Sequence, residues 1–244
     1  MNYKMILEYD GTSYNGWQKQ GNTDRTIQGK LEELLKKLTG EDTEVAGSGR
    51  TDAGVHALGQ VANFRLKEYR EPEELLEEMN RYLPQDIRVL ELKTASERFH
   101  SRLNALRKTY VYRIDRGDKP SVFYRKYRLA YGGPLDVERM KEAADCLLGT
   151  HDFKSFCANK RMKKSTVRCI HEIRIEEQQE VLSIYITGNG FLHHMVRIIV
   201  GTLLEVGSGE KPAACVQEAL DQCDRAAAGQ TAPPHGLFLL KVEY

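Results

Sequence analysis

Hydrophobic and polar residues alternate in short runs along this chain, and stretches with helical periodicity separate those runs. Alternation predicts strands over residues 3–10, 56–64, 87–92, 108–114, 167–175, 181–187 and 237–242. Apolar residues spaced by three and four predict helices over residues 27–38, 72–82, 135–148, 191–204 and 213–222. The chain therefore mixes helices and strands from end to end.

Three of the predicted helices carry recognisable end signals. Thr26 is a candidate N-cap for the helix 27–38, and Gly40 lies just past its end. Pro72 occupies the first position of the helix 72–82, where its missing N–H removes no helical hydrogen bond. Gly149 is expected to stop the helix 135–148.

The order of these elements predicts an α+β fold with two similar halves. Antiparallel hairpins mixed with crossover helices favour two ferredoxin-like (split βαβ) α/β sandwich domains, with a central, mostly antiparallel sheet and an active-site cleft between them. The pattern pauses between residues 93 and 107. We therefore expect an N-terminal domain over residues 1–100, which carries a glycine-rich loop, and a C-terminal domain over residues 101–244.

Composition indicates a soluble, cytoplasmic protein. The 244 residues are 41% hydrophobic and 29% charged, as in ordinary globular proteins. We find no run of eighteen apolar residues and no signal-peptide pattern, so no membrane association is expected. The five cysteines are odd in number and never form Cys-x-x-Cys, which disfavours a disulfide framework or a zinc site and favours a reducing compartment.

The formal net charge of +1 hides a strong segregation of charge. Residues 98–128 hold ten Lys and Arg against only Asp115 and Asp118. A second basic cluster has no acid in it: Lys160, Arg161, Lys163, Lys164 and Arg168. Many of the balancing acids fall within residues 68–78. This pattern indicates a phosphate-contacting face, although a solvated surface with chance clustering gives the same pattern.

Residues 47–57 form a glycine-rich loop that holds candidate chemistry. Three glycines, Arg50, Asp52 and His56 leave room for little that is bulky except Val55. Neither the Walker spacing nor the dinucleotide-binding fingerprint is present, so the loop is not a phosphate cradle. Arg50 and Asp52 share a face if the backbone between them is extended, and the guanidinium could then orient the carboxylate. An ion pair that only pins the loop is the alternative.

The helix 191–204 is apolar on most of its circumference, and Arg197 is its only charged residue apart from two histidines. A buried arginine without an anionic partner costs several kcal/mol. Asp52 is one candidate partner, and a side chain that reaches the surface is the alternative.

Aromatic residues add two further candidates for nucleic-acid contact. Alternation points Tyr110 and Tyr112 to one face of a basic strand, as base stacking requires, but tyrosine is also common in ordinary strands. Trp17, the only tryptophan, lies in a polar, glycine-rich loop and either contacts RNA or fills the core. His193 and His194 are adjacent on the predicted helix and make a poor metal pair, so we expect no metal.

Seven motifs, in order along the whole chain, resemble those of the tRNA pseudouridine synthase A family. They are DGT at 10–12, GWQ at 16–18, GRTDAGVHA at 49–57, KTYVY at 108–112, GTHDFKSF at 149–156, GFLHHMVR at 190–197 and GLFL at 236–239. We see no departure at a position that the family uses for catalysis. The resemblance implies an isomerase that converts uridines at tRNA positions 38, 39 and 40, in the anticodon stem-loop, into pseudouridine without any cofactor.

The resemblance also implies roles for five residues. Asp52 is the expected nucleophile, with Arg197 as its ionic partner and Arg50 in the space of the flipped nucleotide. Tyr110 and Leu237 are expected to hold the two faces of the target uracil. The implied partners are tRNA and a second copy of the chain in a homodimer.

Two other functions remain as alternatives. A non-catalytic, structured-RNA-binding protein would use its sheets for stacking, but we find no RNA-recognition aromatic pattern. A nucleoside hydrolase or glycosidase would need a second carboxylate beside the bond, and no other acid lies in a comparable loop.

Overall fold

The computed structural model describes residues 1–159 and 161–244, so Lys160 of the second basic cluster lies outside the described residues. The described residues form ten strands and five α-helices, which confirms a mixed α/β fold. They divide into two compact units. Unit 1 comprises Met1–Leu106 and Phe238–Tyr244, and unit 2 comprises Arg107–Leu237.

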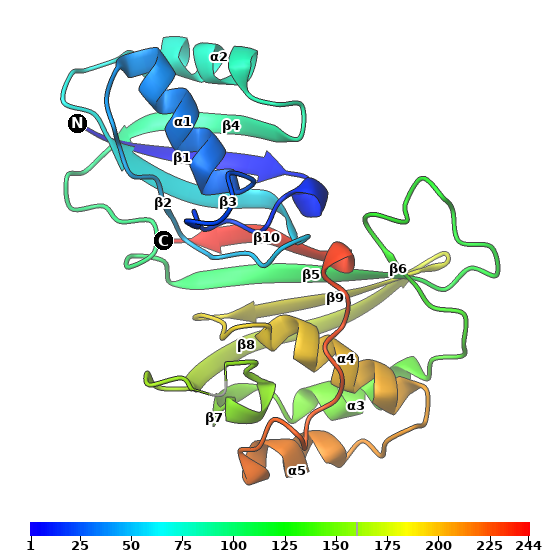
Figure 1. Ribbon diagram of the computed structural model, residues 1–244. Helices are drawn as coiled ribbons and strands as arrows, with labels where there is room; N and C mark the ends of the chain where they lie inside the picture. The colour runs from blue at the N-terminus through cyan, green and yellow to red at the C-terminus, as the bar shows by residue number, and fades with distance from the viewer. Residues whose placement is uncertain (160) are drawn as a thin grey trace. The chain divides into compact units, whose positions relative to one another are not determined.

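Unit 1 contains an open sheet with β1 (Asn2–Tyr9) between β3 (His56–Arg65) and β4 (Ile87–Ala95) (Figure 1). β1 is antiparallel to both of these strands. The short β2 (Ala46–Gly47) pairs antiparallel with β3, and β10 (Leu237–Glu243) runs parallel to the start of β3. The predicted strands 3–10, 56–64 and 87–92 are thus confirmed with small changes at their ends.

Two helices complete unit 1, and both match their predicted spans closely. In α1 (Ile27–Thr39), the Thr26 hydroxyl accepts a hydrogen bond from Gly29 N at 3.2 Å, and Gly40 closes the helix with φ 74°. The N-cap and C-cap predictions are therefore confirmed. α2 (Pro72–Tyr82) begins at its proline. The apolar faces of the helices and strands form the core, in which these residues are fully buried: Tyr3, Met5, Leu7, Leu31, Leu35, Leu75 and Met79.

Unit 2 contributes four further strands, each antiparallel to its neighbours within the unit, and one short parallel strand (Figure 1). Its strand order is β5-β9-β8-β7, with the two-residue β6 (Leu129–Ala130) parallel to the end of β5. The four strands are β5 (Arg107–Asp115), β7 (Gly149–Asp152), β8 (Val167–Gln178) and β9 (Val181–Gly188). β6 and β7, like β2 in unit 1, lack a predicted counterpart, because strands of two to four residues carry almost no alternation.

The helices of unit 2 are α3 (Val137–Asp145), α4 (Met195–Gly207) and α5 (Cys215–Gln222). The predicted helix 135–148 is too long at both ends. Asp136 caps α3 by accepting a hydrogen bond from Arg139 N at 3.1 Å, and Gly149 begins β7 with φ 92° instead of stopping a helix.

The predicted start of the helix 191–204 is also wrong. α4 begins at Met195, because His194 adopts a left-handed conformation with φ 60°. His193 and His194 therefore form a turn, in which the centroids of their rings lie 3.9 Å apart. The helical geometry that we assumed for these two histidines does not hold.

No helix in the described part of the chain is long and apolar enough to cross a membrane. All five cysteines, each within the described residues, are free.

The exposed cap of α3 provides a test of where that helix starts. We expect Asp136→Ala to lower the free energy of unfolding by about 1 kcal/mol, because the Arg139 amide loses its acceptor, whereas Asp136→Asn retains most of the stability. Urea unfolding measures both variants. If the helix instead began at residue 135, alanine at position 136 would be an interior helix former and would not destabilise the protein.

Candidate active site

The glycine-rich loop follows β2 in unit 1 and presents Arg50 and Asp52 two residues apart. Arg50 is exposed, Asp52 is half-buried and Thr51 between them is buried. A turn closes directly after the aspartate, where Val55 N donates to Asp52 O at 3.1 Å and Gly54 has φ 75°. A side chain at Gly54 would be strained in that conformation, so the glycine fixes where the turn can form.

Thr51 attaches the loop to the buried interior of unit 1. Its hydroxyl lies 2.8 Å from the hydroxyl of Tyr9 in the buried interior, and its carbonyl accepts from Trp17 N at 3.0 Å. Burial raises the pKa of Tyr9 above its usual value, so this phenol keeps its proton. The backbone between the two charged residues is thereby attached to β1 and to the N-terminal segment.

Gln60, on β3, is a second anchor, and its role was missed in the sequence. Its side-chain amide donates to Gly49 O at 2.9 Å and accepts from Gly49 N at 3.2 Å, so it pairs with the peptide groups of Gly49 as a neighbouring strand would. It also accepts from the Ser48 hydroxyl at 3.0 Å. Gln60 is fully buried. The available signal was a glutamine at a core position of a predicted strand, since a buried amide needs partners.

The N-terminal segment that contains Gly11 and Trp17 packs directly against the glycine-rich loop. Trp17 is 1% exposed, and a Cβ on Gly47 would stand 2.4 Å from its indole ring. A Cβ on Gly11 would stand 2.0 Å from Val55 O, so the two backbones touch. Of the two predicted roles for Trp17, the structure supports the one in the core and not RNA contact.

His56 anchors the far end of the loop. It is 1% exposed, and its Nδ1 lies 3.0 Å from Gly11 N and 3.1 Å from the Asp10 carboxylate. A ring nitrogen that accepts the amide proton of Gly11 carries no proton of its own, so we assign that bond and not an ion pair. The imidazole also stacks on Phe238 of β10 at 4.7 Å.

Unit 2 carries the other three predicted site residues, among them Tyr110 on β5. Tyr110 is 8% exposed, and its ring meets Phe191 edge to face at 5.2 Å. Tyr112, the second tyrosine of the same face, is fully buried and donates to Pro233 O at 2.9 Å. Burial raises the pKa of Tyr112, and the Arg197 guanidinium opposes part of this rise. Tyr112 is therefore a structural residue.

Arg197 is hydrogen-bonded to the segment that leads to Leu237. Arg197, half-buried on α4, donates from Nε to Ala232 O at 2.7 Å, and Ala232 N donates back to Arg197 O at 3.0 Å. Four residues later, a Cβ on Gly236 would stand 2.7 Å from the Tyr112 ring. These contacts fix the segment that ends in Leu237, which is 4% exposed.

The structure thus brings Arg50 and Asp52 together in one loop, and it joins Arg197 to the segment before Leu237. The pairing of Asp52 with Arg197, and the stacking of Tyr110 and Leu237 on a base, stay predictions. The absence of a metal or cofactor likewise stays a prediction.

Comparison with known proteins finds matches over most of the chain. The sequence model of a family described as tRNA pseudouridine synthase matches residues 5–103 and 143–244. The chain is 47% identical to a tRNA pseudouridine synthase A of Bacillus sp. (strain KSM-64) over 100% of this chain and 99% of that protein. It is 49% identical to tRNA pseudouridine synthase A 1 of Clostridium tetani, with the same coverage of each.

A solved structure titled as a Cbf5-Nop10-Gar1 complex aligns at 14% identity with a TM-score of 0.36. The alignment covers 83% of this chain and 45% of that one, and its score is too low to inform the fold.

Gln60 gives a test of the network behind the loop. Gln60→Leu removes the side chain that pairs with the Gly49 peptide groups and accepts from the Ser48 hydroxyl, so we expect the free energy of unfolding to fall by about 3 kcal/mol. Amide hydrogen exchange at residues 48–51 should accelerate as well. Gln217→Leu, which removes an exposed glutamine on α5, should change stability by less than about 0.5 kcal/mol. Unchanged exchange in Gln60→Leu would contradict the anchoring role.

Proposed function

The chain belongs to the tRNA pseudouridine synthase family, and we propose that it acts on uridines 38, 39 and 40 of the tRNA anticodon stem-loop with Asp52 as its nucleophile. Isomerisation of uridine to pseudouridine in tRNA is the activity of its relatives and of this chain. The observation that carries the assignment of Asp52 is the glycine-rich loop. It holds a carboxylate and a guanidinium on a backbone fixed by Tyr9, Trp17 and Gln60.

The reaction rearranges the nucleotide without adding or removing atoms. The bond from N1 of uracil to C1′ of ribose breaks, the base turns, and a bond from C5 to C1′ forms. C5 loses its hydrogen as a proton, and N1 ends with a proton. The Asp52 carboxylate assists this exchange by attack at C1′ or C6, or by promoting loss of the base. Because the target atoms are stacked inside the RNA, the nucleotide must first leave the stack.

The remaining site residues act on the reacting nucleotide or on Asp52. Arg197 pairs with the Asp52 carboxylate and keeps it ionised and oriented. Arg50 occupies the space of the flipped nucleotide and contacts phosphate. Tyr110 and Leu237 hold the two faces of the uracil. The nearly complete burial of Tyr110 and Leu237 and their packed surroundings support positions with little freedom.

The finer fold proposal is that the chain consists of two ferredoxin-like domains over residues 1–100 and 101–244. The antiparallel order β4-β1-β3-β2 and the crossover helices α1 and α2 support it for the first domain. Phe238–Tyr244, which this proposal assigns to the second domain, clusters with unit 1.

The proposed setting follows from the chemistry of the substrate. The partner is tRNA, whose phosphates face the basic segments, and the active form is a homodimer in the cytoplasm. We propose that the reaction needs no redox cofactor, because uridine and pseudouridine are isomers with the same oxidation state. The five free cysteines agree with a reducing compartment.

Asp52→Asn tests the nucleophile. With tRNA tritiated at C5 of uridine, wild-type protein should release tritium to water and no free uracil. The variant should lose turnover by about 10⁴-fold or more, because a neutral amide cannot replace the carboxylate. Its tRNA affinity should stay within about twofold of the wild-type value.

The exposed Asp24 supplies the control, since Asp24→Asn also removes one carboxylate from unit 1 and should leave tritium release unchanged. Normal turnover by Asp52→Asn would overturn the assignment of the nucleophile. If the wild-type protein bound tRNA but released no tritium, a purely RNA-binding role would be favoured instead.

Arg197 is tested by a pair of variants. Arg197→Met removes the charge and the bond to Ala232, so kcat should fall by about 100-fold and the free energy of unfolding by about 1–2 kcal/mol. Arg197→Lys keeps the charge but lacks the planar guanidinium group, so its kcat should lie between those of the wild type and Arg197→Met. Single-turnover kinetics at saturating tRNA separates this loss from binding. If Arg197→Met lost stability but not kcat, Arg197 would be structural only.

A further inference from the structure

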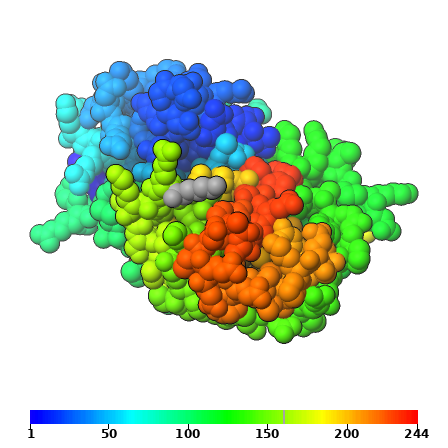
Figure 2. Space-filling view, turned by 60° about the horizontal axis from the view of Figure 1, so that its bottom comes forward, coloured from blue at the N-terminus to red at the C-terminus, as the bar shows by residue number. Residues whose placement is uncertain are grey.

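A second feature of unit 2 includes none of the five proposed site residues, and it gives part of the second basic cluster a specific place. It is a cavity of about 790 Å³ lined by residues from the ranges 152–159 and 162–167 and by Cys223, Asp224 and Arg225, which follow α5. Figure 2 views this face, where the yellow-green segment lies beside the orange-red one. We call it the basic cavity.

The described side chains that line the basic cavity carry more positive than negative charge. Lys154, Lys163, Lys164 and Arg225 line it, against Asp152 and Asp224. The three lysines form no ion pair with any residue of the described ranges 1–159 and 161–244.

Both carboxylates of the basic cavity are used in local turns. Asp152 accepts from Lys154 N at 3.0 Å and from the Thr166 hydroxyl at 2.5 Å, and Asp224 accepts from Ala226 N at 3.0 Å. These hydrogen bonds hold the two carboxylates in place, and neither of them forms an ion pair with Lys154, Lys163 or Lys164.

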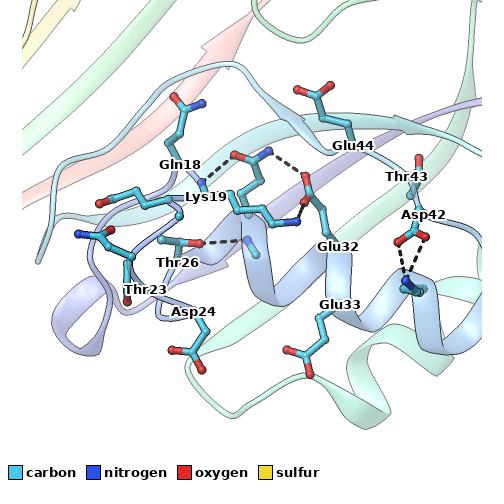
Figure 3. A pocket seen from close by; sticks show the side chains of 16 residues that line it. Gln18, Lys19, Thr23, Asp24, Thr26, Glu32, Glu33, Asp42, Thr43 and Glu44 are labelled. Carbon is cyan, nitrogen blue, oxygen red and sulfur yellow. Dashed lines mark hydrogen bonds and ion pairs between the residues drawn. The ribbon is translucent and has the colours of Figure 1, made fainter.

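The large cavity of unit 1 shows the opposite arrangement (Figure 3). It has a volume of about 1140 Å³, and its lysines are already bound to acids. Lys19 Nζ lies 2.9 Å from Glu32, and Lys36 Nζ lies 2.8 Å from Asp42. Further acids line its wall, so this cavity repels a polyanion and its lysines stabilise the protein itself. The lysines that line the cavity of unit 1 form ion pairs with acids, whereas the described lysines that line the basic cavity do not.

We propose that the basic cavity binds a phosphodiester group of the substrate RNA backbone. The inference rests on the proposed function, because it takes tRNA as the substrate. Three ammonium groups around one hollow suit an anion with several acceptor oxygens, and the Ser165 hydroxyl, which accepts from Val167 N and still has a hydrogen to donate, lines the same wall. The hollow is much larger than one phosphate ion, which favours a phosphate within an extended chain. Such a contact positions the RNA and carries no sequence information.

Loss of this contact should therefore change binding and not chemistry. In the double variant Lys163→Gln/Lys164→Gln, Kd and KM for tRNA should rise by about tenfold at low ionic strength, with kcat unchanged. The slope of log affinity against log salt should fall by about two, because two counterions fewer are released on binding. Lys163→Arg/Lys164→Arg keeps both charges and should restore the wild-type slope.

The control is a second pair of adjacent lysines. Lys36→Gln/Lys37→Gln removes two charges from α1 that are bound to Asp42 and Glu33, and it should leave the salt slope unchanged. A slope that falls equally in both double variants would mean a non-specific charge effect and would overturn the proposal.

Cys223 gives an independent readout, since it is half-buried and lines the basic cavity. Saturating tRNA should slow its alkylation by iodoacetamide at least about threefold, while Cys146 at the end of α3 should react at its usual rate. Unchanged alkylation together with an unchanged slope in Lys163→Gln/Lys164→Gln would overturn the proposal. Protection by inorganic phosphate but not by tRNA would assign the cavity to a free anion instead.

These outcomes are separate from the failure of the proposed function. An active wild type with an inactive Asp52→Asn variant establishes the reaction, whatever the salt slopes are. Conversely, if Asp52→Asn retained turnover, a slope reduced by about two would still place RNA phosphate in the basic cavity.

Discussion

The rest of unit 1 is arranged around one constraint, which is that a loop rich in glycine must be held still. Glycine loses more backbone entropy on folding than any other residue, so a segment such as 47–57 orders only if other contacts compensate. Here the compensation is buried and polar. Gln60 pairs with both peptide groups of Gly49, Tyr9 meets the Thr51 hydroxyl, and Trp17 binds the Thr51 carbonyl. Because these groups are buried away from water, the loss of any of these hydrogen bonds would cost stability. The bonds therefore also fix the backbone that carries Asp52.

Unit 2 solves a similar problem with different residues. The segment that ends in Leu237 has little regular structure, yet it is fixed by a reciprocal pair of bonds between Arg197 and Ala232 and by the ring of Tyr112 against Gly236. Arg197 therefore acts in its own unit as a brace for that segment. In both units, the proposed site residues are held by contacts with buried residues to which no part in the reaction is assigned.

The charge of the chain divides in the same way between structure and binding. A net charge of +1 says little, because lysines near α1 are neutralised by acids while those of the basic cavity are not. An RNA-modifying enzyme needs long-range attraction to phosphate but also a stable fold, and placing paired and unpaired lysines on different elements satisfies both. The distribution of charge is thus more informative than its sum.

The sequence alone determined most of the elements and their order, and it supplied the candidate site residues. Helix 72–82, the caps Thr26 and Gly40 and most strands were predictable because periodicity and capping depend on neighbours in the chain. The motif around Asp52 likewise stands in consecutive residues. Tertiary structure decided what the neighbours in space are: that Trp17 fills the core, that Gln60 holds Gly49, that Tyr112 is buried, and that α4 starts only at Met195. These facts depend on contacts between residues far apart in the sequence, and no local pattern records such contacts.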